Sequence, residues 1–176
     1  IKSNAKVNLA LNIISKSKKL HKIETLISFL KLHDLIHFKE IKSKTHKVFF
    51  WVKFSKNISN KNTIIKLLNI LDKKNLLKNR KFQFKIKKNI PQQAGLGGGS
   101  MNAASILSFL IKKKIIKTNK KTLSYIANYV GSDVALGLKT SNSIMLSNNK
   151  ILRIKNYKRY FVLVVKPNFG CSTKYV

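Results

Sequence analysis

Residues 91–105 are P-Q-Q-A-G-L-G-G-G-S-M-N-A-A-S, and four of the protein's seven glycines lie at positions 95–99 of this stretch. The preceding residues 81–87 alternate between apolar and polar side chains, which predicts a half-buried strand. After two small alanines, the apolar side chains up to residue 111 recur at helical spacing. A strand, a glycine-rich loop and a helix therefore follow one another here, and this order decides the local fold.

This order of elements predicts an anion site. Glycine lets the backbone approach a phosphate group, and the first helical N–H groups point at the anion with the positive end of the helix dipole behind them. Ser100 either caps the helix or places its hydroxyl on a phosphate or a metal ion. The stretch is neither a Walker A loop, because no Gly-Lys-Ser/Thr closes it, nor G-x-G-x-x-G, because Ser100 takes the last position. A tight turn with close backbone packing is the alternative.

The charge of the chain is strongly basic, with 37 lysines and arginines against 5 acidic residues. Such a charge attracts polyanions, but only three of these residues are arginine, the side chain that most often recognises bases and phosphates. The lysines are scattered along every segment, and lysine, asparagine and isoleucine, all with A/T-rich codons, are abundant together. We therefore expect nucleic acid to bind only non-specifically.

Composition also argues against a disulfide, a structural metal site and a membrane segment. The single cysteine, Cys171, allows no disulfide within the chain and fits a reducing compartment. The four histidines lack the spacing of a zinc site, so no structural metal is expected. No apolar run approaches the ~18 residues that span a membrane, and no signal-peptide pattern opens the chain. We expect no membrane partner.

The rest of the chain predicts an α+β protein with a mixed sheet packed against helices. Further strands are expected at residues 5–13, 23–32, 36–41, 48–54, 144–146, 151–154 and 161–165, and further helices at 62–77 and 122–130. Burial of the odd positions of the first strand places Lys6 and Asn8 side by side on its other face. The almost wholly apolar segment 161–165 is expected to be a central strand. Because the chain begins with isoleucine and stops after a turn-like segment, we expect a fragment of a longer protein.

Five carboxylates are the candidates for a general base: Glu24, Asp34, Glu40, Asp72 and Asp133. Glu40 and Asp72 lie among lysines, which predicts surface roles, and Asp34 follows a histidine in a predicted turn. Asp133 differs, because it lies in G-S-D-V between a helix and an apolar stretch. Its local context alone favours a helix N-cap.

Taken together, three segments resemble the GHMP kinase superfamily: A-K-V-N at 5–8, the glycine-rich stretch, and G-S-D-V at 131–134. L-H-K-I-E-T-L at 20–26, K-N-T-I-I-K-L-L at 61–68 and K-P-N-F-G-C-S-T at 166–173 extend the resemblance toward the kinases of 4-diphosphocytidyl-2-C-methyl-D-erythritol. The resemblance covers nearly the whole chain and implies a ribosomal protein S5 domain 2-like fold. It implies an N-terminal ATP-binding and catalytic domain at residues 1–155 and the start of a truncated C-terminal lobe at 156–176. It also implies a location in the bacterial cytoplasm or an organelle of bacterial origin.

The resemblance implies phosphoryl transfer from ATP, with Mg²⁺, to the 2-hydroxyl of this small-molecule substrate of non-mevalonate isoprenoid synthesis. Asp133 would accept the hydroxyl proton, and Lys6 would orient Asp133 and offset negative charge, so both side chains should meet at the mouth of the triphosphate pocket. ATP contacts are implied for Asn62, Pro91, Ala94, Gly95, Leu96, Gly97, Gly98, Gly99, Ser100 and Asn102, with Ser100 also a candidate Mg²⁺ contact. Substrate contacts are implied for Asn8, His21 and Thr173.

Two alternatives remain open. Family members usually have an aromatic side chain that stacks on the cytosine where this chain has Leu20, so a GHMP kinase for another small alcohol is the first alternative. The second is a basic, non-catalytic nucleic-acid-binding domain.

Overall fold

The computed structural model describes residues 1–15, 22–52, 54–55, 58–155, 160–167 and 169–170. It contains strands β1 (Lys2–Ser15), β2 (Lys22–Ile41), β3 (Lys47–Trp51), β4 (Lys81–Lys87), β5 (Ser143–Met145) and β6 (Ile151–Arg153). Its helices are α1 (Thr63–Lys73), α2 (Gly98–Lys112), α3 (Lys120–Val130) and the short α4 (Val134–Gly137). The predicted α+β class is confirmed.

The long strand β2 organises a mixed six-stranded sheet. β1 runs antiparallel along one edge of β2, and β4 and β5 pair with separate parts of β2. β3 joins β4 in parallel, whereas β6 pairs antiparallel with β5. Because Leu35 and Thr25 of β2 each pair with β1 as well, β4 and β5 lie on the edge opposite β1 and leave a stretch of β2 between them.

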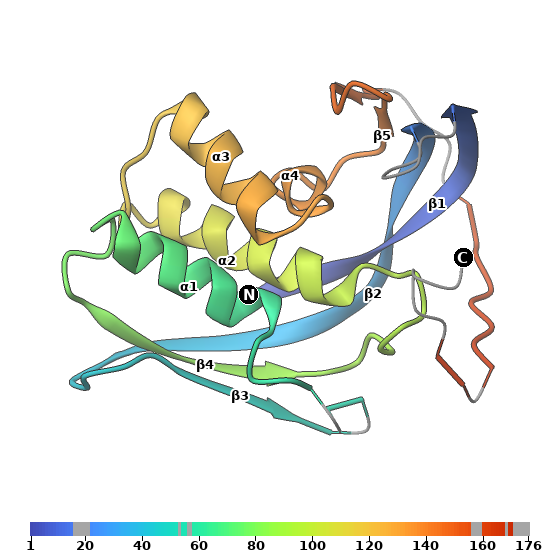
Figure 1. Cartoon of the computed structure of the whole chain (residues 1–176). Helices are drawn as coiled ribbons and strands as arrows, with labels where there is room; N and C mark the ends of the chain where they lie inside the picture. Colours follow the sequence, from blue (N-terminus) through green and yellow to red (C-terminus); the bar gives the residue numbers. More distant parts are fainter. Residues whose placement is uncertain (16–21, 53, 56–57, 156–159, 168, 171–176) are drawn as a thin grey trace.

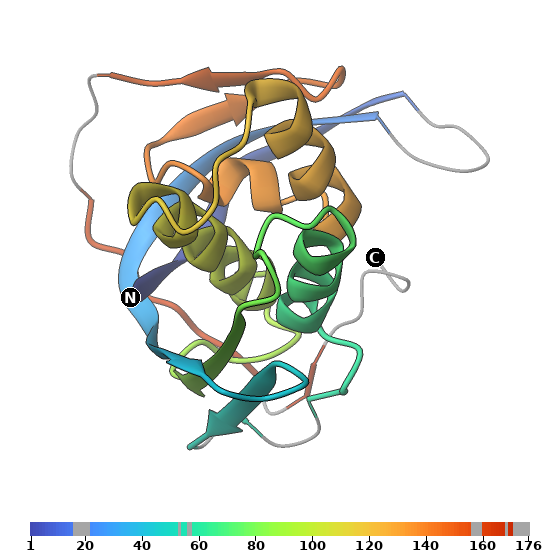
Figure 2. The same cartoon turned by 90° about the vertical axis from the view of Figure 1, so that its left-hand side faces the viewer.

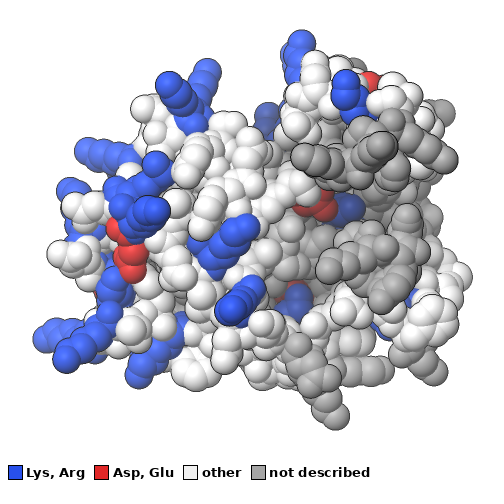
Figure 3. Space-filling model, viewed as in Figure 1, with Lys and Arg blue, Asp and Glu red and all other residues white. Residues whose placement is uncertain are grey.

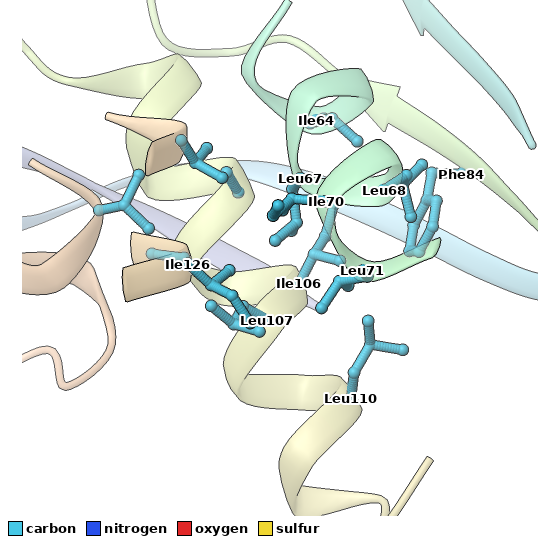
Figure 4. Close-up of a cluster of buried hydrophobic side chains, with 14 of the residues drawn as sticks. Ile64, Leu67, Leu68, Ile70, Leu71, Phe84, Ile106, Leu107, Leu110 and Ile126 are labelled. Atoms are coloured by element: carbon cyan, nitrogen blue, oxygen red, sulfur yellow. The ribbon is translucent and has the colours of Figure 1, made fainter. Parts of the chain in front are cut away.

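The four helices lie on one face of this sheet and form the second layer of the domain (Figures 1 and 2). The alternation of residues 81–87 is confirmed, because Phe82, Phe84 and Ile86 of β4 are fully buried beneath the helices. Figure 4 shows side chains of α1, α2 and α3 converging on the same core, including Leu67, Leu107 and Ile126. Apolar burial of this kind is the main term that stabilises such a domain.

The predicted break between two strands at residues 33–35 is wrong. Residues 23–32 and 36–41 belong to the single strand β2, and Asp34 lies inside it with no exposed surface. Aspartate has a low strand preference, which by itself favours a turn at this position. In the fold, Lys88 and three other hydrogen-bond donors meet this carboxylate, so the strand continues through a polar residue.

The outer half of β1 is exposed, which corrects the expected burial of its odd positions. Ala5 is fully buried, but Leu9 and Leu11 are each 49% exposed and Ile13 is 56% exposed. The β1–β2 hairpin extends past the helices (Figure 1), and its pairing shifts register between Asn8 and Ala10. Alternation predicts the two faces of a strand, but it does not tell how far the covering layer reaches.

The expected central strand at residues 161–165 is also wrong. These residues form no strand with the described part of the chain, and the side chains of Phe161 and Leu163 are almost fully exposed. An apolar run becomes a central strand only when other strands flank it, and none of the described strands does so here. Among the described residues, no helix has the length and apolar character needed to cross a membrane.

Candidate active site

The glycine-rich loop is shaped by contacts that need glycine at position 97. Gly97 is the N-cap of α2 and has a left-handed backbone, with a φ of 67°. A Cβ atom at this position would lie 2.9 Å from Cγ of Lys6, so the stem of that lysine packs directly on the loop backbone. The backbone N–H of Lys6 also donates to the carbonyl of Leu96 (3.0 Å). The start of β1 and the loop are therefore locked together.

Ser100 is not the cap of α2, because the helix begins at Gly98 and the N-cap makes no side-chain hydrogen bond. Its hydroxyl instead lies beside the chain that follows α3, where a Cβ atom on Gly131 would be 3.6 Å from the Ser100 Oγ. The other possibility, a contact to a phosphate or a metal ion, stays a prediction. The start of α2 is thus next to the G-S-D-V segment.

A second helix begins beside the same loop. Asn62 is the N-cap of α1, and its Oδ1 accepts the backbone N–H groups of Ile64 and Ile65 (both 3.1 Å). Thr63 follows and donates its hydroxyl to the carbonyl of Gly99 (2.8 Å). The N-termini of α1 and α2 therefore meet, and both helix dipoles present their positive ends here.

A cavity of about 430 Å³ lies between these two helix starts. It is lined by Phe50, Ile58, Asn62, Thr63, Ile64, Lys88, residues 91–100 and Asn102. All ten residues that the sequence predicts as ATP contacts are in this set. Backbone N–H groups, two helix N-termini and a lysine are the groups that bind a triphosphate, and the apolar side chains suit an adenine ring.

Lys6 and Asp133 form an ion pair at the edge of this loop. The Lys6 Nζ lies 3.6 Å from the Asp133 Oδ2, and the two side chains are 10% and 30% exposed. The Lys6 Nζ also donates to the Oδ1 of Asn8 (2.8 Å), as expected for residues on one face of β1. The lysine and the aspartate therefore meet beside the loop, but neither is among the residues that line the cavity, so their place at its mouth stays a prediction.

Asp133 is held by a closely packed α4. It occupies the N-cap position of α4, but its side chain makes no capping hydrogen bond, so the carboxylate is available to Lys6. Gly137 at the end of α4 lies so near α2 that a Cβ atom there would be 2.7 Å from the Cβ of Ala104. The two small residues let the helices approach and bring Asp133 toward the loop.

Arg153 of β6 fixes the other end of α4. Its guanidinium donates to the carbonyls of Ala135 (3.3 Å), Leu136 (3.1 Å) and Lys139 (2.8 Å), and to the hydroxyl of Ser143 (3.0 Å). Burial lowers the pKa of this guanidinium from its ordinary value. Arg153 thereby satisfies carbonyls that the short helix leaves free.

The sequence of this chain is similar to those of known proteins. Residues 62–145 match the family described as the GHMP kinases N terminal domain. A protein of Pelagibacter ubique named 4-diphosphocytidyl-2-C-methyl-D-erythritol kinase is 58% identical over all of this chain. Residues 62–145 thus have the sequence of a GHMP kinase N-terminal domain.

Two further comparisons agree with this GHMP kinase assignment. A protein of the same name from Clostridium botulinum is 33% identical over 98% of the chain. The solved structure of a 4-(cytidine 5'-diphospho)-2C-methyl-D-erythritol kinase superposes with a TM-score of 0.71 at 23% identity, over 88% of this chain and 54% of that one, and supports the fold. The chain spans 63% and 61% of the lengths of these two curated relatives.

The remaining residues that the sequence predicts for the site have different surroundings in the structure. Asn8 lies beside Lys6, Asn62 uses its side chain as a helix cap, and Asn102 is buried and donates to Asp34. His21 and Thr173 lie outside the described residues. Within the described part of the chain, no three His, Cys, Asp or Glu residues are grouped to hold a metal ion.

Three residues near the site were not predicted: Asp34, Lys88 and Arg153. One signal in the sequence pointed to Asp34, because an acidic residue interrupted an otherwise strand-like stretch, and such local conflicts mark functional positions. Lys88 and Arg153 gave no such signal among so many basic residues. Figure 3 shows lysines and arginines distributed over the face that the helices form, so charge alone does not single out a site.

Proposed function

We propose that this chain forms the nucleotide-binding and catalytic part of a kinase. It would transfer the γ-phosphoryl group of ATP to the 2-hydroxyl of 4-diphosphocytidyl-2-C-methyl-D-erythritol. The observation that carries the proposal is the Lys6–Asp133 ion pair beside the glycine-rich loop. The substrate is taken from the two relatives' names. The reaction belongs in the bacterial cytoplasm or in an organelle of bacterial origin, and residues 156–176 would begin a second lobe.

The described residues divide the chemistry between them. Asp133 is partly exposed and forms no capping bond, so it can accept the proton of an incoming hydroxyl as the oxygen attacks the γ-phosphorus. Lys6 holds the carboxylate in place and offsets negative charge on the transferred group. The N–H groups at the starts of α1 and α2 would bind the other phosphates. Asn8, next to Lys6, would contact the alcohol substrate together with His21 and Thr173.

The residues at the cavity fit a magnesium ion that arrives with the nucleotide. Mg²⁺ prefers oxygen ligands and commonly keeps several waters while binding one or two protein groups and substrate phosphates. The Ser100 hydroxyl, in the first turn of α2, is the group on this wall that would hold it. When bound, the ion would neutralise phosphate charge.

The Asp133→Asn variant tests the proposal. General-base catalysis typically contributes ~10²–10⁴-fold, so we expect phosphorylation of the cytidyl substrate to fall by about this factor while ATP still binds. Glu40→Gln is the matched control, because Glu40 pairs with Arg80 at the surface and lies apart from the loop. The assay uses the protein expressed from its whole reading frame. Equal turnover in wild type and Asp133→Asn would refute the assigned role, and phosphorylation of another small alcohol alone would change the substrate.

A further inference from the structure

Asp34 is a carboxylate with no exposed surface, and its hydrogen bonds go to groups that shape the proposed nucleotide cavity. Its Oδ1 accepts the backbone N–H groups of Asn89 and Ile90 (both 2.8 Å). Its Oδ2 accepts the side-chain amide of Asn102 (2.8 Å) and the ammonium group of Lys88. A buried charge needs such complete pairing, because an unpaired charge in a protein interior is strongly destabilising.

These contacts tie three segments of the chain to one point. Asp34 belongs to β2, residues 88–90 connect β4 to the glycine-rich loop, and Asn102 lies in the second turn of α2. On the edge of β2 that faces away from β1, Asp34 lies between the stretches that pair with β4 and β5. The side chain of Asn89 donates there to the carbonyl of His33 (2.9 Å). The carboxylate therefore sets the position of the start of α2 relative to the sheet.

Lys88 lies directly beneath the first turn of α2. It is only 4% exposed, and a Cβ atom on Gly98 would be 3.2 Å from its Nζ. Lys88 and Asn102 both line the cavity. The Asp34–Lys88 ion pair thus forms part of the wall against which the triphosphate is proposed to bind.

A charge at this place acts strongly on an anion in the cavity. Two unit charges interact across a few ångströms far more strongly in a protein interior than in water. The Lys88 and Asp34 charges offset each other at present, whereas loss of the lysine alone leaves a buried negative charge beside the phosphates. That charge would repel the phosphates of a nucleotide, but it would have little effect on the binding of an uncharged nucleoside.

We propose that Asp34 and Lys88 are positioning residues that hold the first turn of α2 and keep the wall of the nucleotide cavity electrically balanced. This inference rests on the proposed function, because it takes the cavity as the ATP site. It assigns triphosphate affinity to the balance of a buried ion pair as well as to the loop backbone. Loss of the lysine alone should then weaken triphosphate binding more than nucleoside binding, and loss of both charges should restore the discrimination between the two.

The experiment compares ATP with adenosine in four proteins: wild type, Lys88→Met, Asp34→Asn, and the double variant. Dissociation constants are measured by calorimetry on the protein expressed from its whole reading frame, and thermal unfolding shows which variants are folded. The readout is the ratio of the ATP constant to the adenosine constant. A defect of folding or packing alone changes both constants together and leaves this ratio unmoved.

We expect Lys88→Met to raise this ratio roughly tenfold or more, because the Asp34 charge is then uncompensated. Asp34→Asn should leave the ratio equal to or below that of wild type. The double variant should return it to within about threefold of wild type, because the neutral amide introduced at position 34 can exchange hydrogen bonds with Asn102 and no charge remains. If Lys88→Met does not fold, Lys88→Gln takes its place, because the neutral amide can still donate a hydrogen bond to Asp34 while the positive charge is lost. The same rise in the ratio is then expected.

An unchanged ratio in Lys88→Met, a raised ratio in Asp34→Asn, or no recovery in the double variant would each overturn the inference. A failure of the proposed function would give a different result. In that case wild type itself would bind neither ATP nor adenosine. Wild-type ATP binding with a flat ratio across the variants would reject only the role of the ion pair.

Discussion

The Lys6 Nζ lies 3.6 Å from the Asp133 Oδ2, and the stem of the same lysine packs on Gly97. One side chain therefore contacts both the proposed catalytic carboxylate and the loop that would hold the triphosphate. A change of the loop backbone at Gly97 would therefore displace the lysine that pairs with the carboxylate. The geometry of the ion pair therefore depends on the shape of the glycine-rich loop.

Replacing Lys6 with methionine keeps its length but removes the charge. We expect kcat for phosphoryl transfer to fall ~10²–10³-fold, the range seen when one group that stabilises transition-state charge is lost. The apparent KM for ATP should change much less, because the loop backbone and the helix starts remain. Lys2→Met is the control on the same strand, since Lys2 is exposed. A loss confined to the KM for ATP would contradict the role given to Lys6.

Gly97→Ala and Gly95→Ala separate backbone strain from the contact with Lys6. Both glycines have a left-handed backbone, with φ of 67° and 69°, so each alanine should cost stability of about 1–2 kcal/mol. Only at position 97 would the new Cβ strike Lys6, because nothing lies within 4 Å of a Cβ at Gly95. We expect a similar loss of stability in both variants but at least about tenfold lower kcat in Gly97→Ala than in Gly95→Ala, since misplacement by about 1 Å can cost 10²-fold. Urea unfolding and steady-state kinetics measure the two quantities, and equal kcat values would show that the contact has no catalytic consequence.

Arg153→Met should release the end of α4 that follows Asp133. Hydrogen bonds to a charged group are worth ~1.5–3 kcal/mol, so the free energy of unfolding should fall by about 2 kcal/mol. We also expect kcat to fall while the dissociation constant for ATP stays the same, because Arg153 contacts the segment after Asp133 and does not line the cavity. Arg80→Met is the matched control, since the exposed Arg80–Glu40 pair is screened by water and should contribute little to stability. Similar losses of stability in both variants would contradict the prediction.

Stability should depend on pH through His46. The His46 Nδ1 accepts the backbone N–H of Phe82 (3.1 Å), and its Nε2 faces the Oδ2 of Asp72 (3.2 Å), so the folded protein favours the neutral ring. Burial lowers the pKa of His46 below its ordinary 6.5, although Asp72 acts in the opposite direction. The unfolded chain therefore binds the proton more readily than the folded protein does. The contribution of the neutral His46 ring to the free energy of unfolding is complete above about pH 6.5 and decreases as the pH falls toward the pKa of the folded state.

Urea unfolding between about pH 5 and 7.5 measures this effect. The decrease below about pH 6.5 should be smaller in His46→Gln than in wild type. It should persist in His33→Gln, because His33 on β2 is only partly buried and its ring hydrogen-bonds with the nearby carbonyl of Lys31. A curve for His46→Gln that keeps the full decrease would assign it to another group.

The regular elements were predictable from the sequence where one pattern determined the result. The alternation at 81–87 and the helical spacing after the glycines correspond to β4 and α2, whose buried faces meet in one core. Patterns failed where the outcome depended on neighbours distant in sequence. Asp34 remains inside a strand because Lys88 pairs with it, and the segment 161–165 has no strand beside it among the described residues.

The candidate site was only partly predictable for the same reason. The glycine-rich stretch indicated an anion site by itself, because glycines and a helix start act locally. Asp133 had only the appearance of a helix cap, and its pairing with Lys6 followed from the resemblance to GHMP kinases, because no spacing in the chain encodes it. Arg153 could not be distinguished from the other basic residues, since its importance lies in the carbonyls of a short helix that forms only in the fold.

The contact between Gly137 and Ala104 has a consequence for how this domain can vary. With 2.7 Å between the Cβ of Ala104 and a Cβ added at residue 137, the two positions share one fixed volume. A methyl group gained at one position has to be given up at the other, or α4 moves outward and takes its preceding aspartate with it. The position of the proposed general base is thus limited by the combined size of two residues that lie outside the lining of the cavity.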